Sequence, residues 1–148
     1  YNPVMDELFT AEKGKGAFLN DRRRLRVAAR KTLADAVIVT GIPHRGRKGH
    51  ERFLQEAEVV MREVAGLRRT GSAALDLAYT AAGRFDGYWE YGLGAWDIAA
   101  GALLVREAGG FITDPAGGTA LLATGNVVAG NKAVQEALRT LLADAGKE

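Results

Sequence analysis

The chain contains no cysteine, two histidines and three prolines. Without cysteine it has no disulfide, no thiol nucleophile and no cysteine-based zinc site, and this composition fits a reducing compartment, so we expect a cytoplasmic protein. Neither His44 nor His50 has a second histidine at metal-ligand spacing, and we interpret both as loop residues rather than metal ligands or catalytic bases. No apolar run reaches the length needed to cross a bilayer, so we expect no association with a membrane.

The overall composition is that of an ordinary globular domain. The 148 residues are 47% hydrophobic and 26% charged, with a formal net charge of +2. This length predicts one compact domain, and neither repeats nor linkers divide it. The first four residues, YNPV, match neither a signal peptide nor a translation start, so we expect residues 1–148 to begin within a longer protein.

Basic residues are concentrated between positions 20 and 52, where they include Arg22, Arg23, Arg24 and Arg26. A cluster of this kind attracts phosphates and nucleic acid. However, the region carries no interleaved aromatic residue beyond Phe53 and no recognisable RNA-binding motif. We therefore favour a solvated hairpin and loop, and keep nucleic-acid binding as an alternative.

Short apolar runs alternate with segments of helical periodicity, a pattern typical of α/β proteins. The β-branched run at 36–42 predicts a central strand that is covered on both faces. We predict a hairpin from 8–11 and 17–19, and further strands at 25–28, 36–42, 86–90, 111–113 and 127–129. We predict helices at 51–64, 71–82, 96–108 and 132–143. The expected fold class is α/β, with a mixed β-sheet flanked by helices.

The most informative segment is residues 96–101, with the sequence WDIAAG. It places Asp97 in the first turn of a helix whose side chains are almost all apolar, which predicts a buried helix. A buried carboxylate is costly unless it is hydrogen-bonded or bound to a cation. Asp97 is therefore either a helix cap or a metal ligand, and Glu90, across a loop with Gly92 and Gly94, is near enough in sequence to share the site.

A second helix opens in a similar way at residues 70–73, with the sequence TGSA. The free backbone N–H groups of a helix N-terminus bind phosphate or hydroxyl oxygens readily, and Arg68 and Arg69 precede this one. An ordinary helix start is the alternative explanation of the pattern. Ser72 has no neighbouring histidine or lysine that could activate it, so we interpret it as a helix cap and not as a nucleophile.

Taken together, these segments resemble the inositol monophosphatase family, and its bacterial branch most closely. The matching segments are residues 67–79, 83–90, 96–101 and 107–110, and the match extends through 1–9, 14–20 and 125–131. The match is specific because it combines four features: the WD pair, the AAG that follows it, the upstream Glu90 and the downstream glycine pair. The resemblance covers nearly the whole chain.

The resemblance implies a magnesium-dependent phosphomonoesterase that acts on a small phosphorylated polyol, with inositol monophosphate as the leading substrate and Mg²⁺ as the cofactor. The implied fold is a layered α-β-α-β-α sandwich, of which residues 1–148 supply the carboxyl-terminal half. By the same resemblance, Asp97 is catalytic, ligates metal and contacts the substrate, and Glu90 binds a substrate hydroxyl. The backbone of Gly71, Ser72 and Ala73 would line the substrate pocket. We also expect a homodimer.

The family's other metal ligands lie before the region that corresponds to Tyr1. They are a Glu and the segment Asp-Pro-x-Asp-Gly-Thr, and neither is present in this chain. Residues 114–119, DPAGGT, are similar to that segment, but Gly117 stands where its second Asp should be, and we interpret them as a glycine-rich turn. We therefore expect residues 1–148 to be inactive alone and to act only when joined to the amino-terminal, metal-binding half.

Two alternatives to an inositol phosphatase remain open. Gly94 and Ala95 replace the residues that bacterial relatives often carry before Trp96, so the substrate could instead be a sugar bisphosphate or a nucleotide bisphosphate, as in related phosphatases. Bacterial members of this branch are also associated with transcription and ribosomal RNA synthesis. The chain could therefore be a non-catalytic module that binds RNA or the transcription machinery through Arg22, Arg23, Arg24 and Arg26.

Overall fold

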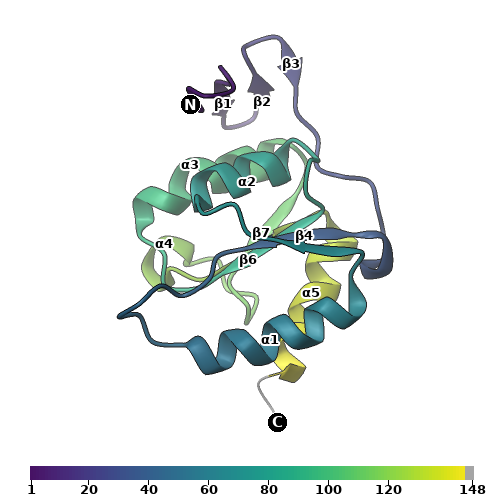
Figure 1. Cartoon of the computed structure of the whole chain (residues 1–148). Coiled ribbons are helices and arrows are strands. Elements are labelled where there is room, and N and C mark those ends of the chain that lie inside the picture. The colour runs from purple at the N-terminus through teal and green to yellow at the C-terminus, as the bar shows by residue number, and fades with distance from the viewer. Residues whose placement is uncertain (146–148) are drawn as a thin grey trace.

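The structure of the chain, a computed structural model, describes residues 1–145. A five-stranded sheet is covered by helices on both faces, and a small three-stranded sheet lies beyond one of these helix layers (Figure 1). The strands are β1 (Phe9–Glu12), β2 (Gly16–Leu19), β3 (Arg23–Arg24), β4 (Val37–Thr40), β5 (Gly66–Arg68), β6 (Gly87–Glu90), β7 (Phe111–Thr113) and β8 (Val127–Gly130). The helices are α1 (His50–Glu63), α2 (Ala73–Ala81), α3 (Ala95–Glu107), α4 (Leu121–Thr124) and α5 (Lys132–Ala145), with a 3₁₀ turn at Leu33–Asp35.

The five-stranded sheet is mixed, with the strand order β5-β4-β6-β8-β7. Its strand β4 runs parallel to β5 and to β6, whereas β8 runs antiparallel to β6 and to β7. The chain folds in this way because α1 connects β4 to β5 and α2 connects β5 to β6, and parallel neighbours require such crossover connections. The predicted α/β class, with a mixed sheet between helices, is confirmed.

Side chains of successive strand residues point to opposite faces of the sheet and build two separate cores. Val39 and Tyr88 join a buried cluster with residues of α2 and α3. Their neighbours Ile38 and Trp89 join a second cluster with residues of α1 and α5. This separation explains the continuous apolar run of β4, because both of its faces are buried.

The helices α2 and α3 form the layer between the two sheets and pack closely against each other (Figure 1). Gly101, the glycine of the WDIAAG segment, faces Leu77 of α2, and a Cβ added at Gly101 would lie 2.5 Å from the Leu77 Cβ. Only a residue without a side chain allows this approach. The close contact fixes the position of one helix relative to the other and buries Ile98 and Val105 beneath them.

The antiparallel sheet β1–β2–β3 packs on the outer side of this helix layer. Ala17 and Leu25 are buried in the same cluster as residues of α2 and α3. In the last turn of α3, the Glu107 carboxylate accepts hydrogen bonds from the backbone N–H groups of Gly14 at 2.8 Å and Gly16 at 2.9 Å. These two bonds tie the β1–β2 turn to the carboxyl end of α3.

Two expectations about local structure are wrong, one about a strand at 25–28 and one about the burial of the WDIAAG helix. No strand forms at 25–28: the third strand is Arg23–Arg24, and after it only the Leu25 N–H still bonds to β2, donating to the Ala17 carbonyl at 2.8 Å. The Val27 N–H donates instead to the Ala108 carbonyl, at 3.2 Å, beyond the end of α3.

The WDIAAG helix is not buried on all sides in the described chain. Ile98 and Val105 are buried, but Trp96 is 85% exposed, and Ala99 and Ala100 are exposed beside it. The apolar residues of this helix therefore lie partly on the surface and partly in the core.

None of the helices in residues 1–145 is both long enough and apolar enough to span a membrane.

One edge of the sheet collects the features that matter for function. The carboxyl ends of the parallel strands β4, β5 and β6 meet there. Because α2 follows β5 and α3 follows β6, the N-termini of both helices lie at the same edge. In open α/β sheets, this carboxyl edge is where ligands bind.

The contact between Gly101 and Leu77 leads to a stability prediction. We expect Gly101→Val to lower the free energy of unfolding by about 2 kcal/mol or more, because the added carbons overlap Leu77 and force the helices apart. Ala100→Val is the matched control, since Ala100 is exposed on the same helix and should cost about 0.5 kcal/mol through helix propensity alone. Equal losses in the two variants, measured by denaturant unfolding, would contradict the packing argument.

Candidate functional site

A cavity of about 200 Å³ opens at this edge between α2, α3 and the ends of the strands. Four of the residues singled out in the sequence line it: Gly71, Ala73, Glu90 and Asp97. The fifth, Ser72, is not among the lining residues. The structure thus brings together residues that lie on β6 and at the starts of two helices.

Glu90 reaches the cavity from the end of β6. It lies two residues after Tyr88 and therefore points to the same face of the sheet, where the Tyr88 hydroxyl donates to Glu90 Oε2 at 2.7 Å. Burial raises the pKa of the Glu90 carboxyl, while the Tyr88 hydrogen bond and the Arg47 charge oppose that rise. Burial also raises the pKa of the Tyr88 hydroxyl, so Tyr88 acts as a neutral donor.

The backbone at Gly41 is shaped to fit the Glu90 side chain. Gly41 follows β4 directly, and the register of β4 with β6 places it beside Glu90. A Cβ added at Gly41 would overlap the Glu90 carboxylate. Gly41 was not among the residues predicted for the site. In the sequence it continues an apolar β-branched run, so only the strand pairing reveals its contact with Glu90.

Asp97 lies in the first turn of α3 and caps its helix. Its Oδ2 accepts a hydrogen bond from the Gly94 backbone N–H at 3.0 Å. Within residues 1–145, no hydrogen bond reaches the other oxygen, Oδ1. Oδ2 therefore caps the helix, and Oδ1 remains available to a cation or a hydrogen-bond donor in the cavity. Asp97 can thus be both a helix cap and a metal ligand.

The segment before α2 is held by a buried carboxylate. Gly71 has a φ of +100°, a left-handed conformation that other residues rarely adopt. The Ser72 Oγ accepts from the Leu75 N–H at 3.4 Å, as predicted for a helix cap. Thr70 Oγ1 donates to Asp76 Oδ1, and this bond ties the segment to the first turns of α2.

Asp76 is itself an unusual group. It is fully buried, and its Oδ2 is the only buried side-chain polar atom in residues 1–145 without a hydrogen-bond partner. Burial raises its pKa from 3.8 to about 6, and the Glu90 charge adds to this rise, while Thr70 and Arg69 oppose it. Asp76 was not predicted as a buried residue, because a single acid in an amphipathic helix is normally exposed.

Three basic residues surround the acids of the cavity. His44 and Arg47 come from the loop between β4 and α1, and Arg69 comes from the end of β5. Both arginines favour the ionised form of Glu90 and so lower its pKa. They also make the cavity suitable for an anion, because guanidinium groups bind phosphate oxygens strongly. In the sequence Arg69 stands out because it precedes the helix N-terminus at 70–73, whereas Arg47 appears only as one of the basic residues between positions 20 and 52.

The carboxylates of this chain do not form a complete metal site. In residues 1–145, no three His, Asp or Glu side chains come close enough to hold a metal ion together. Asp97 nevertheless has the chemistry of a Mg²⁺ ligand, with one carboxylate oxygen free of hydrogen bonds. The residues present thus fit a site to which this chain contributes one metal ligand.

Asp76 should make stability depend on pH. Because its pKa in the folded state, about 6, exceeds the ordinary value of 3.8, the stability it contributes is present at low pH and lost as pH rises from about 4 to 6. Asp76→Asn resembles the protonated acid and still accepts from Thr70. We expect the free energy of unfolding of Asp76→Asn minus that of wild type to increase by about 2 kcal/mol between pH 4 and pH 7.5. A constant difference across this range would contradict the assignment.

Comparison with known proteins shows which family the chain is similar to. The model of the inositol monophosphatase family matches residues 1–147. An inositol-1-monophosphatase of Mesorhizobium japonicum is 64% identical over 138 residues, which are 93% of this chain and 52% of that protein. A protein named Nus factor SuhB, from Pseudomonas aeruginosa, is 48% identical over 143 residues, which are 95% of this chain and 52% of that protein.

The three-dimensional comparison agrees. The crystal structure of the extragenic suppressor protein suhB from Bartonella henselae superposes with a TM-score of 0.92 at 57% identity, covering 96% of this chain and 54% of that one. The chain spans about half the length of the curated relatives it matches. Since the family model matches residues 1–147 and the structural match covers 96% of the chain, the chain belongs to the inositol monophosphatase family.

Proposed function

We propose that a longer protein containing this chain hydrolyses a phosphate monoester, with inositol monophosphate as the leading substrate. The observation that carries the proposal is the cavity in which Asp97, Glu90 and the Gly71 segment meet at the N-termini of two helices. Helix N-termini and arginines favour a phosphate, while carboxylates favour a metal ion and hydroxyl groups. The name of the Mesorhizobium relative is consistent with this combination.

In this proposal, Asp97 is a catalytic residue that ligates Mg²⁺ through Oδ1 and faces the phosphate. When bound, Mg²⁺ would supply Lewis-acid stabilisation of phosphate charge and a bound water of lowered pKa. The cap at Gly94 holds the Asp97 carboxylate in place, so the ligand needs no rearrangement. The N–H groups of Gly71, Ser72 and Ala73 would bind substrate oxygens from the other helix.

Glu90 would bind a hydroxyl group of the substrate. Its Oε2 is already satisfied by Tyr88, so Oε1 is the oxygen left to accept from a polyol hydroxyl. Because Glu90 is partly buried, water solvates its carboxylate poorly. An Oε1 atom without a hydrogen-bond donor would therefore cost free energy, and a substrate hydroxyl would remove that cost. Tyr88 is a positioning residue, since it reaches the substrate only through Glu90.

We further propose that this chain is the carboxyl-terminal half of that protein and that the remaining metal ligands come from the other half. The exposed apolar stripe of Trp96, Ala99 and Ala100 on α3 supports this, because such stripes are normally covered. Covering it would complete a further layer of the sandwich. Assembly into a homodimer and residence in the cytoplasm are parts of the same proposal.

The role of Asp97 can be tested in the longer protein with Asp97→Asn. As a cap alone, loss of the charge should cost about 1 kcal/mol of stability and leave turnover nearly intact. As a metal ligand, it should lower kcat by about a hundredfold or more and weaken magnesium binding, with little change in the melting temperature measured without magnesium.

Glu90→Gln is the matched comparison for this test. We expect it to raise KM or change substrate preference while magnesium affinity changes less, because an amide keeps the size of the side chain and part of its hydrogen bonding. Near-normal turnover in Asp97→Asn with a lower magnesium-free melting temperature would leave Asp97 as a helix cap. Equal loss of magnesium binding in both variants would remove the distinction between ligand and substrate contact.

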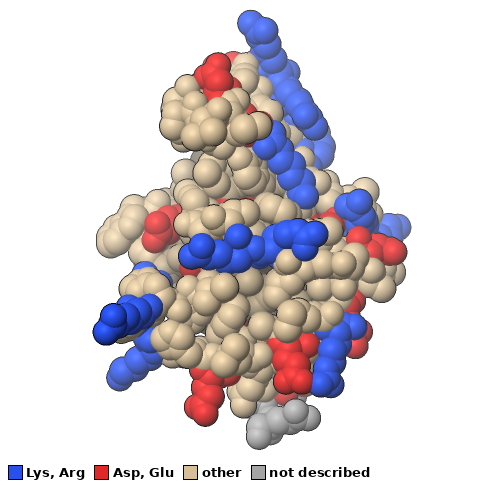
Figure 2. Space-filling model, in the orientation of Figure 1, with Lys and Arg blue, Asp and Glu red and all other residues tan. Residues whose placement is uncertain are grey.

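A second candidate function is binding to RNA or to the transcription machinery. Arg22, Arg23, Arg24 and Arg26 are all exposed, and none forms an ion pair within the described residues. Figure 2 shows basic side chains gathered at the end of the molecule where β2 and β3 lie. Relatives named Nus factor SuhB are consistent with this alternative.

This alternative predicts binding that needs no metal. RNA should be retained by the protein in the presence of chelator and released as salt increases. Replacing Arg22 and Arg23 with Gln should weaken binding and reduce the slope of log K against log salt by about 2. Lys132→Gln, at the exposed start of α5, is the control. Binding that is lost with chelator, or equally lost in the control, would rule out this surface.

A further inference from the structure

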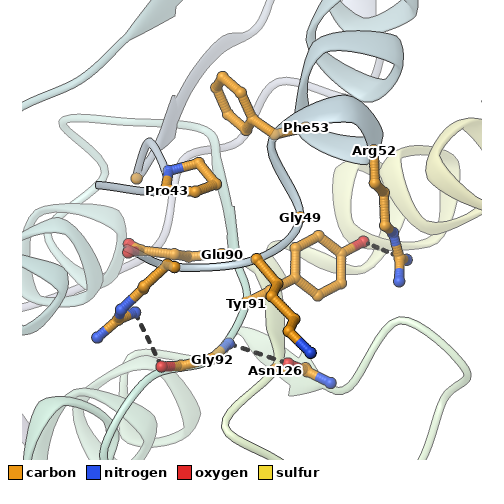
Figure 3. A pocket seen from close by; sticks show the side chains of 11 residues that line it. Pro43, Gly49, Arg52, Phe53, Glu90, Tyr91, Gly92 and Asn126 are labelled. Atoms are coloured by element: carbon orange, nitrogen blue, oxygen red, sulfur yellow. Dashed lines mark hydrogen bonds between the residues drawn. The ribbon is translucent and has the colours of Figure 1, made fainter. Parts of the chain in front are cut away.

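A second cavity, of about 480 Å³, lies beside the candidate site, and both are lined by Gly41, Arg47 and Glu90. In Figure 3, which looks into this cavity, the Glu90 carboxylate is directed to one side and the Tyr91 ring to the other, where its hydroxyl is hydrogen-bonded to Arg52. These consecutive residues point in different directions, as side chains alternate along a strand. The end of β6 thus presents Glu90 to the candidate site and Tyr91 to α1.

Both residues that flank Glu90 are bound to one buried acid. Trp89 and Tyr91 pack into the cluster of α1 and α5, and both donate to Glu56 of α1, which is fully buried. Glu56 Oε2 accepts from the Trp89 indole N–H at 3.2 Å, and Oε1 accepts from the Tyr91 hydroxyl at 2.7 Å. The Arg52 Nε also donates to Oε1, at 2.7 Å, and supplies the opposite charge that a buried carboxylate needs.

A carboxylate suits this position better than any other side chain. The three groups that face Glu56 all act as donors: two N–H groups and one hydroxyl. A glutamine has the same length, but its NH₂ group would face the N–H of either Trp89 or Arg52. A buried donor that loses its acceptor costs free energy, so the end of β6 would shift or lose an anchor. Glu56 lines neither cavity and can affect a ligand only through its neighbours.

The backbone around Glu90 is held by separate hydrogen bonds. The Thr40 hydroxyl, on the neighbouring strand, donates to the Trp89 carbonyl at 2.8 Å. Beyond the strand, the Gly92 N–H donates to Asn126 Oδ1 at 3.1 Å. These backbone bonds fix where residue 90 lies. The side-chain anchors of its two neighbours fix the rotation of the strand end, and therefore the direction of the Glu90 carboxylate.

We propose that Glu56 is a positioning residue that directs the Glu90 carboxylate toward a substrate hydroxyl. The proposal rests on the role of Glu90 in the proposed phosphatase function. Glu56 holds Trp89 and Tyr91 against α1, and this keeps the carboxylate between them in the cavity that contains Asp97. A binding group must be held within roughly 0.5 Å of its productive position. Loss of the anchors should therefore weaken recognition of the polyol more than the reaction at phosphorus.

The test uses the longer magnesium-loaded protein with two substrates, inositol 1-phosphate and 4-nitrophenyl phosphate, which has no hydroxyl group for Glu90. We expect Glu56→Gln to lower kcat/KM for inositol 1-phosphate about fivefold, mainly through KM, and to change kcat/KM for 4-nitrophenyl phosphate by less than about twofold. Tyr91→Phe removes one anchor and keeps the ring, so its effect should be smaller and in the same direction. It replaces Glu56→Gln if that variant does not fold.

Glu58→Gln is the matched control. It removes the same charge from α1, but Glu58 is exposed and pairs with Arg62 on the same helix. Both values of kcat/KM should stay within about twofold of wild type, because a surface ion pair contributes little. A loss in Glu56→Gln that is equal for the two substrates, or equal to the loss in Glu58→Gln, would overturn the proposal.

A double-mutant cycle shows whether Glu56 acts through Glu90. In a Glu90→Gln background, we expect Glu56→Gln to lower kcat/KM for inositol 1-phosphate by less than about twofold, because the carboxylate that it directs is already absent. A fivefold loss in both backgrounds would mean that the two residues act independently, and the positioning role would be wrong.

Hydrogen exchange separates this proposal from the proposed function, because it needs no activity. We expect the backbone amides of residues 89–92 to exchange faster in Glu56→Gln than in wild type or Glu58→Gln. If wild type hydrolyses neither substrate, the phosphatase function fails. Faster exchange in Glu56→Gln then retains the positioning of Glu90, and unchanged exchange overturns it. If wild type is active and Glu56→Gln matches Glu58→Gln in kinetics, only the positioning role is overturned.

Discussion

The close contact between α2 and α3 is the constraint on which the rest of the structure depends. Gly101 lets Leu77 approach the α3 backbone, and this fixes the two helices as one unit beneath the small sheet. Because both helices start at the carboxyl edge of the parallel strands, fixing their packing also fixes the distance between the Gly71 segment and Asp97. A site made from two helix N-termini needs such rigidity, since its N–H groups and its carboxylate must meet the same ligand.

The second constraint is the placement of carboxylates in partly buried positions. Strand alternation places Glu90 on the same face as Tyr88, and Gly41 provides the space for it on the neighbouring strand. Asp76 lies nearby with one oxygen unpaired, and the pKa of both carboxyls is raised by burial. Burying acids lowers the stability of a fold, and such acids concentrate where binding or catalysis requires them.

Much of the architecture could be predicted from the sequence because its elements have strong local periodicity. The strand at Phe111–Thr113 agrees with its predicted bounds, and helix α1 differs from prediction by a single residue at each end. The short helix Leu121–Thr124 was not predicted, because four residues carry no periodic signal. The strand predicted at 25–28 failed for a different reason: the chain leaves β2 after Leu25, and the Val27 N–H donates to the Ala108 carbonyl beyond α3, a contact that only the tertiary structure creates.

The candidate site also contains residues that could be predicted from the sequence and residues that could not. Asp97, Glu90, Gly71 and Ala73 could be singled out from motifs, and they line one cavity. The residues that were missed act through contacts that only the fold creates, such as Gly41 beside Glu90 and Thr70 bound to Asp76. Basic residues of the β4–α1 loop were visible only as an undifferentiated charge cluster.

The loop between β4 and α1 contributes to the cavities in a different way from the rigid elements around it. The helix starts and strand ends present the groups suited to phosphate chemistry, and their positions are fixed by two buried cores. The loop between β4 and α1 brings Arg47 to both cavities and Lys48 to only one. Loops tolerate sequence change better than packed elements do. A change in this loop can therefore alter the charge that lines the two cavities, while the groups at Asp97 and Gly71 stay in place. Glu90 lines both cavities, so its surroundings depend on this loop as well as on the packed strands.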